Sequence, residues 1–394
     1  MSPLCESFLS ADDLDRMEPF YPLHARICEE CLLVQLDAHV PAAEIFGGDY
    51  AYFSSYSDSW VEHARVFAES ARGRFGLGPT SLVVEVASND GYLLQHFAAA
   101  GIPVLGIDPA RNVAEAAGHR GVETIVDFFG GRLSEQLAGR GRRADLLVAN
   151  NVLAHVPDVN DFVRGIATVL APGGVATIEV PHLVRLIEGL QFDTIYHEHY
   201  SYFSFGTLVK LFPRHGLQIF DVEELTSHGG SLRLFVRHAG GDPLGSVPAL
   251  LAREVSAGYA SLAGYEGFGE RVAETKRRLL ALLIELRRAG KQVAGYGAPG
   301  KGNTLLNYCG IRTDFLDYTV DRNPGKHGKF LPGTHIPVHP PEKLAETRPD
   351  YILVLPWNLK KEIMQQLSHV RDWAGQLVVP IPRPEILAWD TSAR

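Results

Sequence analysis

The densest group of side chains that can transfer protons lies in the segment 196–200, which reads Tyr-His-Glu-His-Tyr. It places His197, Glu198 and His199 in a row, and histidine changes its charge near neutral pH, which suits a general acid or base. A metal site on His197 and His199 is one alternative, although the spacing is not that of His-Glu-x-x-His and no third ligand stands out. A purely structural role for both histidines is the other alternative.

A further histidine, His155, follows a predicted strand at residues 144–149. Ligands of open α/β sheets bind beyond the carboxyl ends of the strands, so we expect His155 to face the reacting groups. The aromatic, serine-rich segment 50–60 adds Tyr50 as a candidate, with aromatic packing as its alternative.

A turn of small residues follows the predicted strand 82–87 and contains Ala87, Asn89 and Gly91. Such a turn lets a ligand approach the backbone and offers it the free N–H groups of the next helix. An NAD enzyme would have Gly-x-Gly-x-x-Gly here, and the carboxylate of Glu85 would repel a pyrophosphate. The same carboxylate suits the sulfonium and ammonium of S-adenosylmethionine, which the sequence therefore favours over NAD.

Asp108 closes the next predicted strand, 102–107, where a carboxylate can hold ribose hydroxyls. Its alternative role is the N-cap of the helix that follows. Asp127 and Phe128 fall where an adenine pocket would lie. Three more residues are assigned to the same ligand: Asn150, Tyr56 and Ser57.

A second glycine-rich turn, Gly-Tyr-Gly-Ala-Pro-Gly-Lys-Gly at residues 295–302, fits Gly-x-Gly-x-x-Gly and nearly fits a Walker A loop. The Walker match fails at Gly302, where a hydroxyl should contact Mg²⁺. Residues 289–394 carry 13 basic and 10 acidic side chains, although the whole chain has a net charge of −9. We interpret the turn as a cradle for a nucleotide phosphate, with an ordinary strand-to-helix turn as the alternative.

Strands and helices alternate from residue 82 to residue 180 and again from 267 to 355. This alternation predicts an α/β protein with a doubly wound, mostly parallel sheet and a second, Rossmann-like α/β domain. We expect a small N-terminal domain at 1–60, a ligand-binding domain at 61–222 and a C-terminal domain at 223–394.

The chain has 394 residues, a pI of about 6.0 and four cysteines. The absence of a basic surplus argues against nucleic-acid binding, and no run of 18 apolar residues predicts a membrane span. The start has neither a basic nor an apolar signal region, and four clustered cysteines do not form a disulfide framework. We therefore expect a cytoplasmic protein that acts on a small molecule.

Eight segments carry a resemblance that runs nearly end to end. They are Cys28-x-x-Cys31-Leu-Leu-Val-Gln-Leu36, Tyr50-x-Tyr-Phe-Ser-Ser-x-Ser57, Glu85-Val-Ala-Ser-Asn-Asp-Gly91, Asn150-Asn-Val-Leu-Ala-His155, Tyr196-His-Glu-His199, His228-Gly-Gly-Ser-Leu-Arg233, Gly295-Tyr-Gly-Ala-Pro-Gly-Lys301 and Leu355-Pro-Trp-Asn358. Together they resemble the S-adenosylmethionine-dependent C-methyltransferases that act on dTDP-4-keto-deoxyhexoses in deoxysugar and antibiotic biosynthesis.

The resemblance implies a small zinc-binding domain, a class I methyltransferase domain and a C-terminal domain that helps to hold the nucleotide-sugar. It implies His199 as the base that removes a proton beside the ketone, at C-3', with Tyr196, Glu198, His155 and Tyr50 as helpers. The residues expected to contact the dTDP-sugar are Tyr52, His228, Gly230, Ser231, Arg233, Gly297, Lys301, Asn303, Arg322, Trp357 and Asn358.

The resemblance also implies a second Cys-x-x-Cys pair upstream of the first residue here. Only Cys28 and Cys31 are present as a pair, and the spacing of Cys5 and His24 does not complete it. Two ligands do not close a structural zinc site, so either the N-terminus is truncated or the metal is absent.

Three other functions stay open from the sequence. A nicotinamide-dependent sugar-nucleotide reductase or epimerase would use the turn at 295–302. An O- or N-methyltransferase would share the fold without needing a carbon acid. A non-catalytic nucleotide-binding protein would not need the combination of Glu85, His155 and His199.

Overall fold

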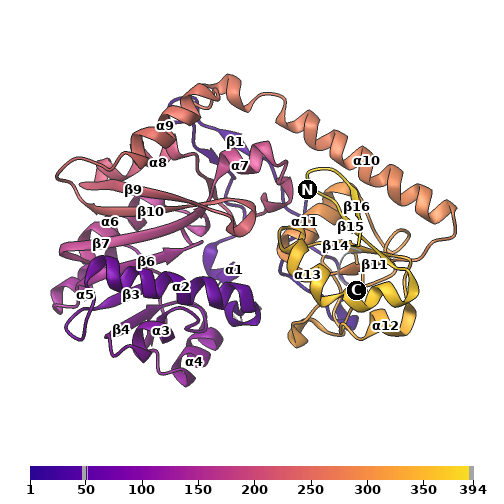
Figure 1. The fold of residues 1–394 in the computed structure, drawn as a ribbon, viewed down its shortest axis with the longest axis horizontal. Helices are drawn as coiled ribbons and strands as arrows, with labels where there is room; N and C mark the ends of the chain where they lie inside the picture. The colour runs from indigo at the N-terminus through magenta and orange to yellow at the C-terminus, as the bar shows by residue number, and fades with distance from the viewer. Residues whose placement is uncertain (47–49, 51, 390–394) are drawn as a thin grey trace.

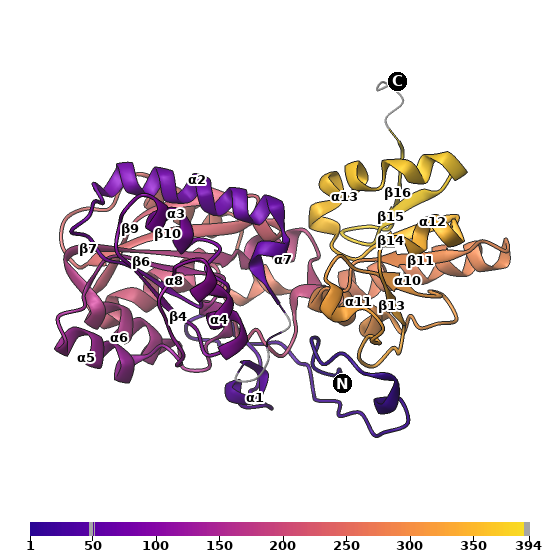
Figure 2. The ribbon, with the colours of Figure 1, turned by 90° about the horizontal axis from the view of Figure 1, so that it is seen from below.

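A computed structural model describes residues 1–46, 50 and 52–389. Two α/β bodies lie side by side, and the N-terminal segment runs along one side of both (Figures 1 and 2). The fold class predicted from the sequence is confirmed, because each body contains a mostly parallel sheet.

The first body contains a seven-stranded sheet in the order β5-β4-β3-β6-β7-β10-β9. The first five of these strands are parallel, and β10 and β9 are antiparallel additions at one edge. The strands are β3 (Val83–Val86), β4 (Val104–Ile107), β5 (Thr124–Ile125), β6 (Ala144–Asn150), β7 (Leu170–Pro181), β9 (Leu217–Leu225) and β10 (Ser231–His238).

Alternate residues of β3 pack on opposite faces of this sheet. Val83 packs with α2 (Asp58–Phe75), α3 (Leu94–Ala99) and α4 (Arg111–His119), whereas Val84 and Val86 pack with α5 (Gly131–Gly139), α6 (Val159–Val169) and α8 (Phe205–Leu211). Because all four side chains of β3 are buried, the strand reads as a continuous apolar run interrupted by one glutamate.

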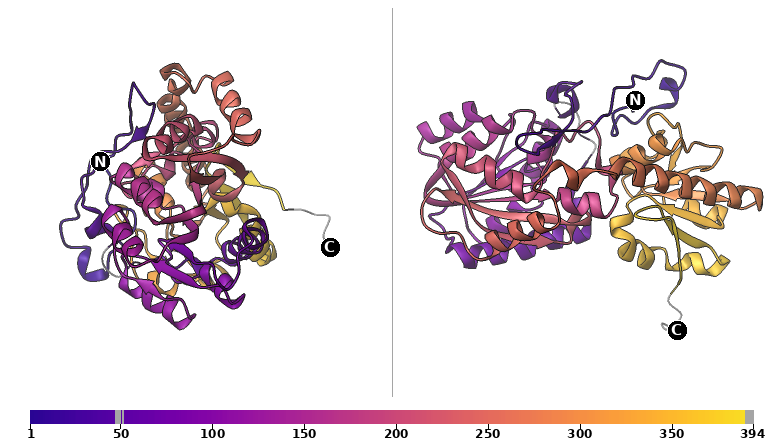
Figure 3. Two further views of the ribbon diagram at one scale, coloured as in Figure 1. Left: turned by 90° about the vertical axis from the view of Figure 1, so that its left-hand side faces the viewer. Right: turned by 90° about the horizontal axis from the view of Figure 1, so that it is seen from above.

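The second body contains a six-stranded sheet in the order β13-β12-β11-β14-β15-β16, parallel except for β16. The strands are β11 (Val293–Tyr296), β12 (Thr319–Val320), β13 (Val338–His339), β14 (Tyr351–Val354), β15 (Gln376–Val379) and β16 (Glu385–Leu387). The helices are α10 (Phe268–Arg288), α11 (Gly300–Cys309), α12 (Lys343–Thr347) and α13 (Lys360–Gln366), and α10 lies along the outer side (Figure 3).

A small third sheet, β1-β2-β8, joins the N-terminal segment to the chain just after the histidine cluster. Its strands are β1 (Arg26–Ile27), β2 (Val34–Gln35) and β8 (Ser201–Tyr202). The remaining helices are α1 (Ala42–Phe46), α7 (Leu183–Glu188) and α9 (Ser246–Ser256).

The domain boundary expected at residues 222 and 223 falls inside β9. The next strand, β10, pairs with both β7 and β9, so the first sheet continues to His238. The sequence analysis missed both edge strands because it followed the alternation of strands and helices, which antiparallel neighbours do not show. Within the described part of the chain, no helix is long and apolar enough to span a bilayer.

Glu254 of α9 links this helix to the first body through hydrogen bonds, just before the chain continues into the second body. Its buried carboxylate accepts hydrogen bonds from the backbone N–H groups of Phe205 and Gly206, both at 2.8 Å, and lies 2.6 Å from His182 Nε2. These contacts satisfy N–H groups at the start of α8 that have no partner inside the helix.

We predict that Glu254→Ala lowers the free energy of unfolding by about 2–4 kcal/mol, because it leaves two backbone donors and His182 unpaired. Urea denaturation followed by circular dichroism measures the change. Glu285→Ala, at an exposed position on α10, is the matched control. Equal denaturation midpoints for the two variants would contradict the role of Glu254.

Candidate active site

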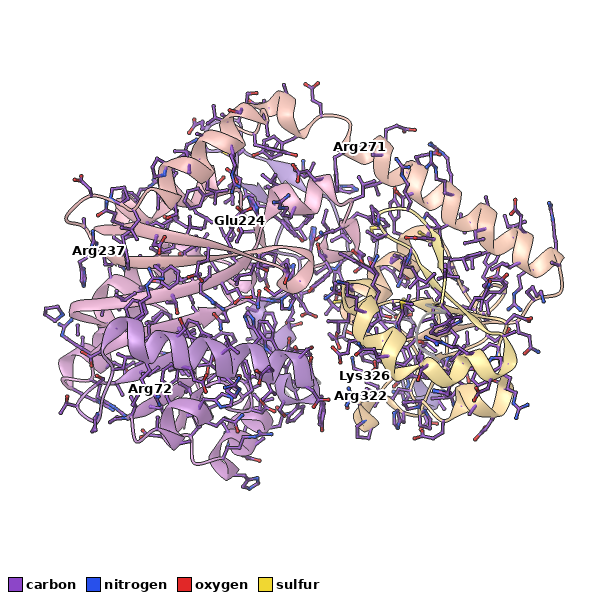
Figure 4. The ribbon with its side chains drawn as sticks, in the orientation of Figure 1. Arg72, Glu224, Arg237, Arg271, Arg322 and Lys326 are labelled. Atoms are coloured by element: carbon purple, nitrogen blue, oxygen red, sulfur yellow. The ribbon has the colours of Figure 1, made fainter. Side chains whose placement is uncertain are left out.

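A cavity of about 790 Å³ lies between the two bodies and is lined by both of them and by the N-terminal segment. Arg322 and Lys326, which line it, lie on the side of the second body that faces the first (Figure 4). The cavity therefore brings together parts of the chain that are far apart in sequence.

The turn after β3 forms one end of the cavity. Ala87, Asn89 and Gly91 have left-handed backbones, with φ of 56°, 47° and 79°. A Cβ on Gly91 would lie 3.2 Å from a side-chain atom of Val122 and 3.3 Å from one of Ala117. The turn is thus as tight as its small residues suggested, and Ala87 and Asn89 line the cavity.

Asn89 ties the aromatic segment to this turn. Its Oδ1 accepts a hydrogen bond from the backbone N–H of Ser54 at 2.9 Å, and its Nδ2 donates to the carbonyl of Tyr52 at 3.1 Å. Farther along, Asn112 exchanges hydrogen bonds of 3.1 and 2.9 Å with the backbone of Tyr50. The aromatic segment is consequently held over the ligand end of the cavity.

Asp108 is buried at this end and lines the cavity. Its two carboxylate oxygens accept the backbone N–H groups of Asn89 and Ala110, each at 2.9 Å. Burial raises its pKa, and these two N–H groups oppose the rise. Ala110 itself is the N-cap of α4, so Asp108 supports the helix start while each of its oxygens keeps a lone pair for a ligand.

Glu85 is not brought into the cavity. Its side chain is 1% exposed and shares with Val83 the sheet face covered by α2 and α3. Burial raises its pKa well above the usual range, and the nearby phenol of Tyr92 opposes the rise. The expected direct contact between Glu85 and a cationic ligand does not fit this placement.

Gly91 does not line the cavity either, but the remaining residues assigned to the methyl donor do. Its lining includes Tyr56, Ser57, Asp127, Phe128 and Asn150. Asn150 ends β6, and its Oδ1 is buried without a hydrogen-bond partner in the described part of the chain. An unpaired buried acceptor fits the ammonium of S-adenosylmethionine, and Asp108 fits its ribose.

His199 lies in the cavity wall with its ring fixed by one hydrogen bond. Its Nδ1 is 3.0 Å from the carbonyl oxygen of Thr194. A carbonyl only accepts, so Nδ1 carries the proton and Nε2 has the free lone pair. Burial lowers the pKa of His199 well below its usual value, and the neighbouring His155 lowers it further. His199 is therefore neutral and has a basic nitrogen available.

Other proton-transfer groups surround His199. Its ring centroid lies 4.6 Å from that of His155 and 4.2 Å from that of Tyr196. Burial lowers the pKa of His155 to about 4. Burial also raises the pKa of Tyr196 and of Tyr50 well above the usual range, so both phenols keep their protons and can donate hydrogen bonds. All four side chains line the cavity.

Glu198 faces the N-terminal segment, so it does not orient His199 as a direct partner. Its Oε1 accepts a hydrogen bond from the Cys5 thiol at 3.3 Å, and it is 4% exposed. Burial raises the pKa of Glu198 to about 8, and the nearby carboxylate of Glu6 contributes to the rise. His197 points elsewhere, with its Nε2 3.0 Å from the carbonyl of Pro22.

A carboxylate occupies the expected phosphate cradle. The Glu6 carboxylate lies against the start of α11, where its Oε1 would be 3.1 Å from a Cβ on Gly300, and it is 3.6 Å from Lys326 Nζ. Asn303 holds this segment by donating to the carbonyl of Cys5 at 2.5 Å. The sequence analysis missed Glu6 and Thr194 and did not link Cys5 to Glu198, because no local pattern connects residues 5 and 6 to residues 198 and 300.

Lys301 lines the cavity beside this turn, and its ammonium is held by Asn358 and Trp357, which do not line the cavity. Its Nζ donates to Asn358 Oδ1 at 2.7 Å and lies 5.3 Å from the centroid of the Trp357 ring. Trp357 in turn donates from Nε1 to Asp193 at 2.7 Å. Trp357 and Asn358 thus stand behind the cavity wall, where they support Lys301.

The remaining substrate candidates divide into two groups. Tyr52, His228, Gly297 and Arg322 line the cavity. Gly230, Ser231 and Arg233 do not: the guanidinium of Arg233 is paired with Glu179 at 3.1 Å inside the sheet, and Ser231 starts β10 and bonds its hydroxyl to the backbone. Packing within the first sheet accounts for these three residues.

The residues present do not fit a zinc centre. Cys28 and Cys31 are free thiols, Cys5 is buried against Glu198, and Cys309 lies in the core of the second body. Among the described residues, no group of three or more His, Cys, Asp or Glu side chains could hold a metal.

Comparisons with known proteins agree with this architecture. The "C-methyltransferase C-terminal domain" family matches residues 226–382, a "Methyltransferase domain" family matches 60–222, and a "Putative zinc binding domain" matches 1–46. The chain is 38% identical over 393 residues to C-methyltransferase NovU of Streptomyces niveus, which covers 99% of this chain and 93% of that protein.

The chain belongs to the C-methyltransferase family. It is an S-adenosylmethionine-dependent enzyme, as the sequence predicted. A shorter likeness, 34% identity over 107 residues, relates 26% of this chain to 43% of a ubiquinone biosynthesis O-methyltransferase of a Methylobacterium species.

Solved methyltransferase structures are similar only at a distance. The CcbJ methyltransferase of Streptomyces caelestis gives a TM-score of 0.36 at 14% identity, covering 45% of this chain and 90% of that one. Magnesium protoporphyrin IX methyltransferase of Synechocystis, with bound SAH, gives 0.37 at 14% identity, covering 45% and 83%. Likenesses at this level carry no inference about this C-methyltransferase.

The raised pKa of Glu198 predicts how the stability of the enzyme depends on pH. The folded protein keeps the proton on Glu198 up to about pH 8, whereas the unfolded chain releases it near the ordinary value. Stability should therefore fall as pH rises from about 4.5 to 8. We predict that Glu198→Gln flattens this fall, measured as the melting temperature from pH 5 to 8.5. A variant whose melting temperature falls as steeply as that of the wild type would contradict the prediction.

Proposed function

We propose that this enzyme transfers a methyl group from S-adenosylmethionine to the carbon beside the ketone of a dTDP-linked 4-keto-deoxysugar, at C-3', in deoxysugar and antibiotic biosynthesis. The observation that carries the proposal is the neutral, fixed imidazole of His199. It lies in a cavity that extends from the donor end at Asp108 to the cation Arg322 in the second body.

A carbon beside a ketone is not nucleophilic until it loses a proton. His199 Nε2 is the acceptor for that proton, and the phenols of Tyr196 and Tyr50 are donors for the oxygen on which negative charge develops. When bound, S-adenosylmethionine supplies the electrophilic methyl group. His155 lies against His199 and helps to keep water from its ring.

The expected magnitudes explain why two bodies enclose one cavity. A placed base gives about 10²–10⁴-fold, and one oxyanion donor contributes roughly 3–4 kcal/mol. Holding the two reactants in line adds ~7–11 kcal/mol. No single group supplies enough, so base, donors and both ligands must be held together.

The nucleotide is assigned to the second body, with its diphosphate near Arg322. This guanidinium lines the cavity, and its paired carboxylate, Asp58 at 3.4 Å, is largely exposed. The turn at 297–300 is less suitable, because the Glu6 carboxylate already lies against Gly300 and would repel a phosphate. The same carboxylate and Pro299 disfavour the alternative of a nicotinamide dinucleotide bound to this turn.

O- or N-methylation would use the donor site equally well, but neither removes a proton from carbon. We predict that a panel of dTDP-4-keto sugars incubated with S-adenosylmethionine yields a product heavier by one methyl group, detected by mass spectrometry. Proton NMR should show the new methyl group on a ring carbon. A methyl signal on oxygen or nitrogen would overturn the proposal.

We also predict that His199→Asn strongly slows exchange of the proton beside the ketone, measured by NMR in D₂O without S-adenosylmethionine. Exchange should fall about 10²–10⁴-fold, because the variant has no basic ring nitrogen. Binding of S-adenosylmethionine should persist, since the donor is assigned to Asp108 and Asn150 and not to His199. Full exchange in the variant would remove His199 from the role of base.

A further inference from the structure

Three histidines and one ammonium line the same cavity, and the ammonium has no assigned role in the proton transfer. His155, His199 and His228 line the cavity together with Lys301. The charge of Lys301 contributes to the low pKa of both His199 and His228. Lys301 therefore lines the same cavity as the proposed base, although the sequence suggested that it binds the diphosphate.

Packing between the bodies gives the same location. Lys301 lies in the first turn of α11, and this helix packs on the segment Phe192–Thr194. The carbonyl of Thr194 in that segment accepts the hydrogen bond that fixes the ring of His199. The segment Trp357–Leu359, which supports Lys301, packs on Ser227–Gly229, which carries His228. Lys301 lies over the Trp357 ring, which donates to Asp193 beside Thr194, so the segments that hold the ammonium are packed against those that position His199 and carry His228.

The Lys301 ammonium also has N–H groups that are not used by the described residues. An ammonium has three N–H groups, and the described residues provide one hydrogen-bond acceptor, Asn358 Oδ1 at 2.7 Å. The Trp357 ring and the buried carboxyl of Asp193 compensate its charge without taking the other two donors. These donors are available to an oxygen of a bound substrate.

We propose that Lys301 is a catalytic residue that stabilises the enolate oxygen, and that it does not bind the diphosphate. This inference rests on the proposed function. His199 Nε2 takes the proton from carbon, the C–H electron pair forms the C=C bond, and the ketone oxygen becomes negative beside the Lys301 N–H. On methyl transfer that pair forms the new C–C bond, the S–CH₃ electrons stay on sulfur and the ketone returns.

The test compares Lys301→Met with Lys301→Arg, and with Lys361→Met at an exposed position of α13 as the control. The probe is dTDP-4-keto-6-deoxyglucose in D₂O without S-adenosylmethionine, with exchange at C-3' followed by proton NMR. Calorimetry measures the Kd of dTDP, and a separate titration measures that of S-adenosylmethionine to show that each variant is folded.

We expect Lys301→Met to slow exchange by about 10²–10³-fold, with the Kd of dTDP changed less than threefold. Lys301→Arg should recover part of the rate because it restores the charge, and Lys361→Met should match the wild type. An unchanged exchange rate, or a Kd of dTDP raised tenfold or more with exchange intact at saturating probe, would overturn the role of Lys301. If the wild type itself shows no exchange, the proposed function fails with it.

Discussion

The hydrogen bond from His199 Nδ1 to the carbonyl of Thr194 constrains the chemistry of the whole site. It fixes the tautomer, so the basic nitrogen faces the cavity, and it does so without a carboxylate partner. A carboxylate would have stabilised the imidazolium and raised its pKa. The carbonyl instead leaves the buried His199 ring neutral, because burial disfavours its charged form. The ring can then accept a proton from a substrate carbon.

The N-terminal segment is part of the active site and joins both bodies. Glu6 occupies the start of α11, Cys5 bonds to Glu198, and Asn303 holds the backbone between them. A phosphate at the same helix start would have to displace a carboxylate that Lys326 already partners. Helix N-termini attract any anion, and here the protein supplies its own.

The sequence predicted most of what depends on local pattern. The alternation of strands and helices in both bodies, the small-residue turn and the histidine cluster are visible as runs and spacings, whereas the short strands β5 and β13 and the later strand β15 were not predicted. Contacts between distant segments were not visible in the sequence. Glu198 was expected to help the base His199, but it faces Cys5. Arg233 was expected to bind the substrate, but it pairs with Glu179. The sequence can show that a charged side chain will be buried, but the group that pairs with it depends on how distant segments pack together.

The turn at residues 85–91 led to the prediction of S-adenosylmethionine, but Glu85 itself does not line the cavity. An acid inside a buried strand is unusual, and it distinguished this turn from a dinucleotide loop. Yet strand alternation directs its side chain to the face under α2 and α3, while Asp108 and Asn150, at the ends of neighbouring strands, reach the cavity. In a parallel sheet the carboxyl ends of strands meet at one edge, so residues there share a ligand, whereas a residue one position earlier contributes to the core.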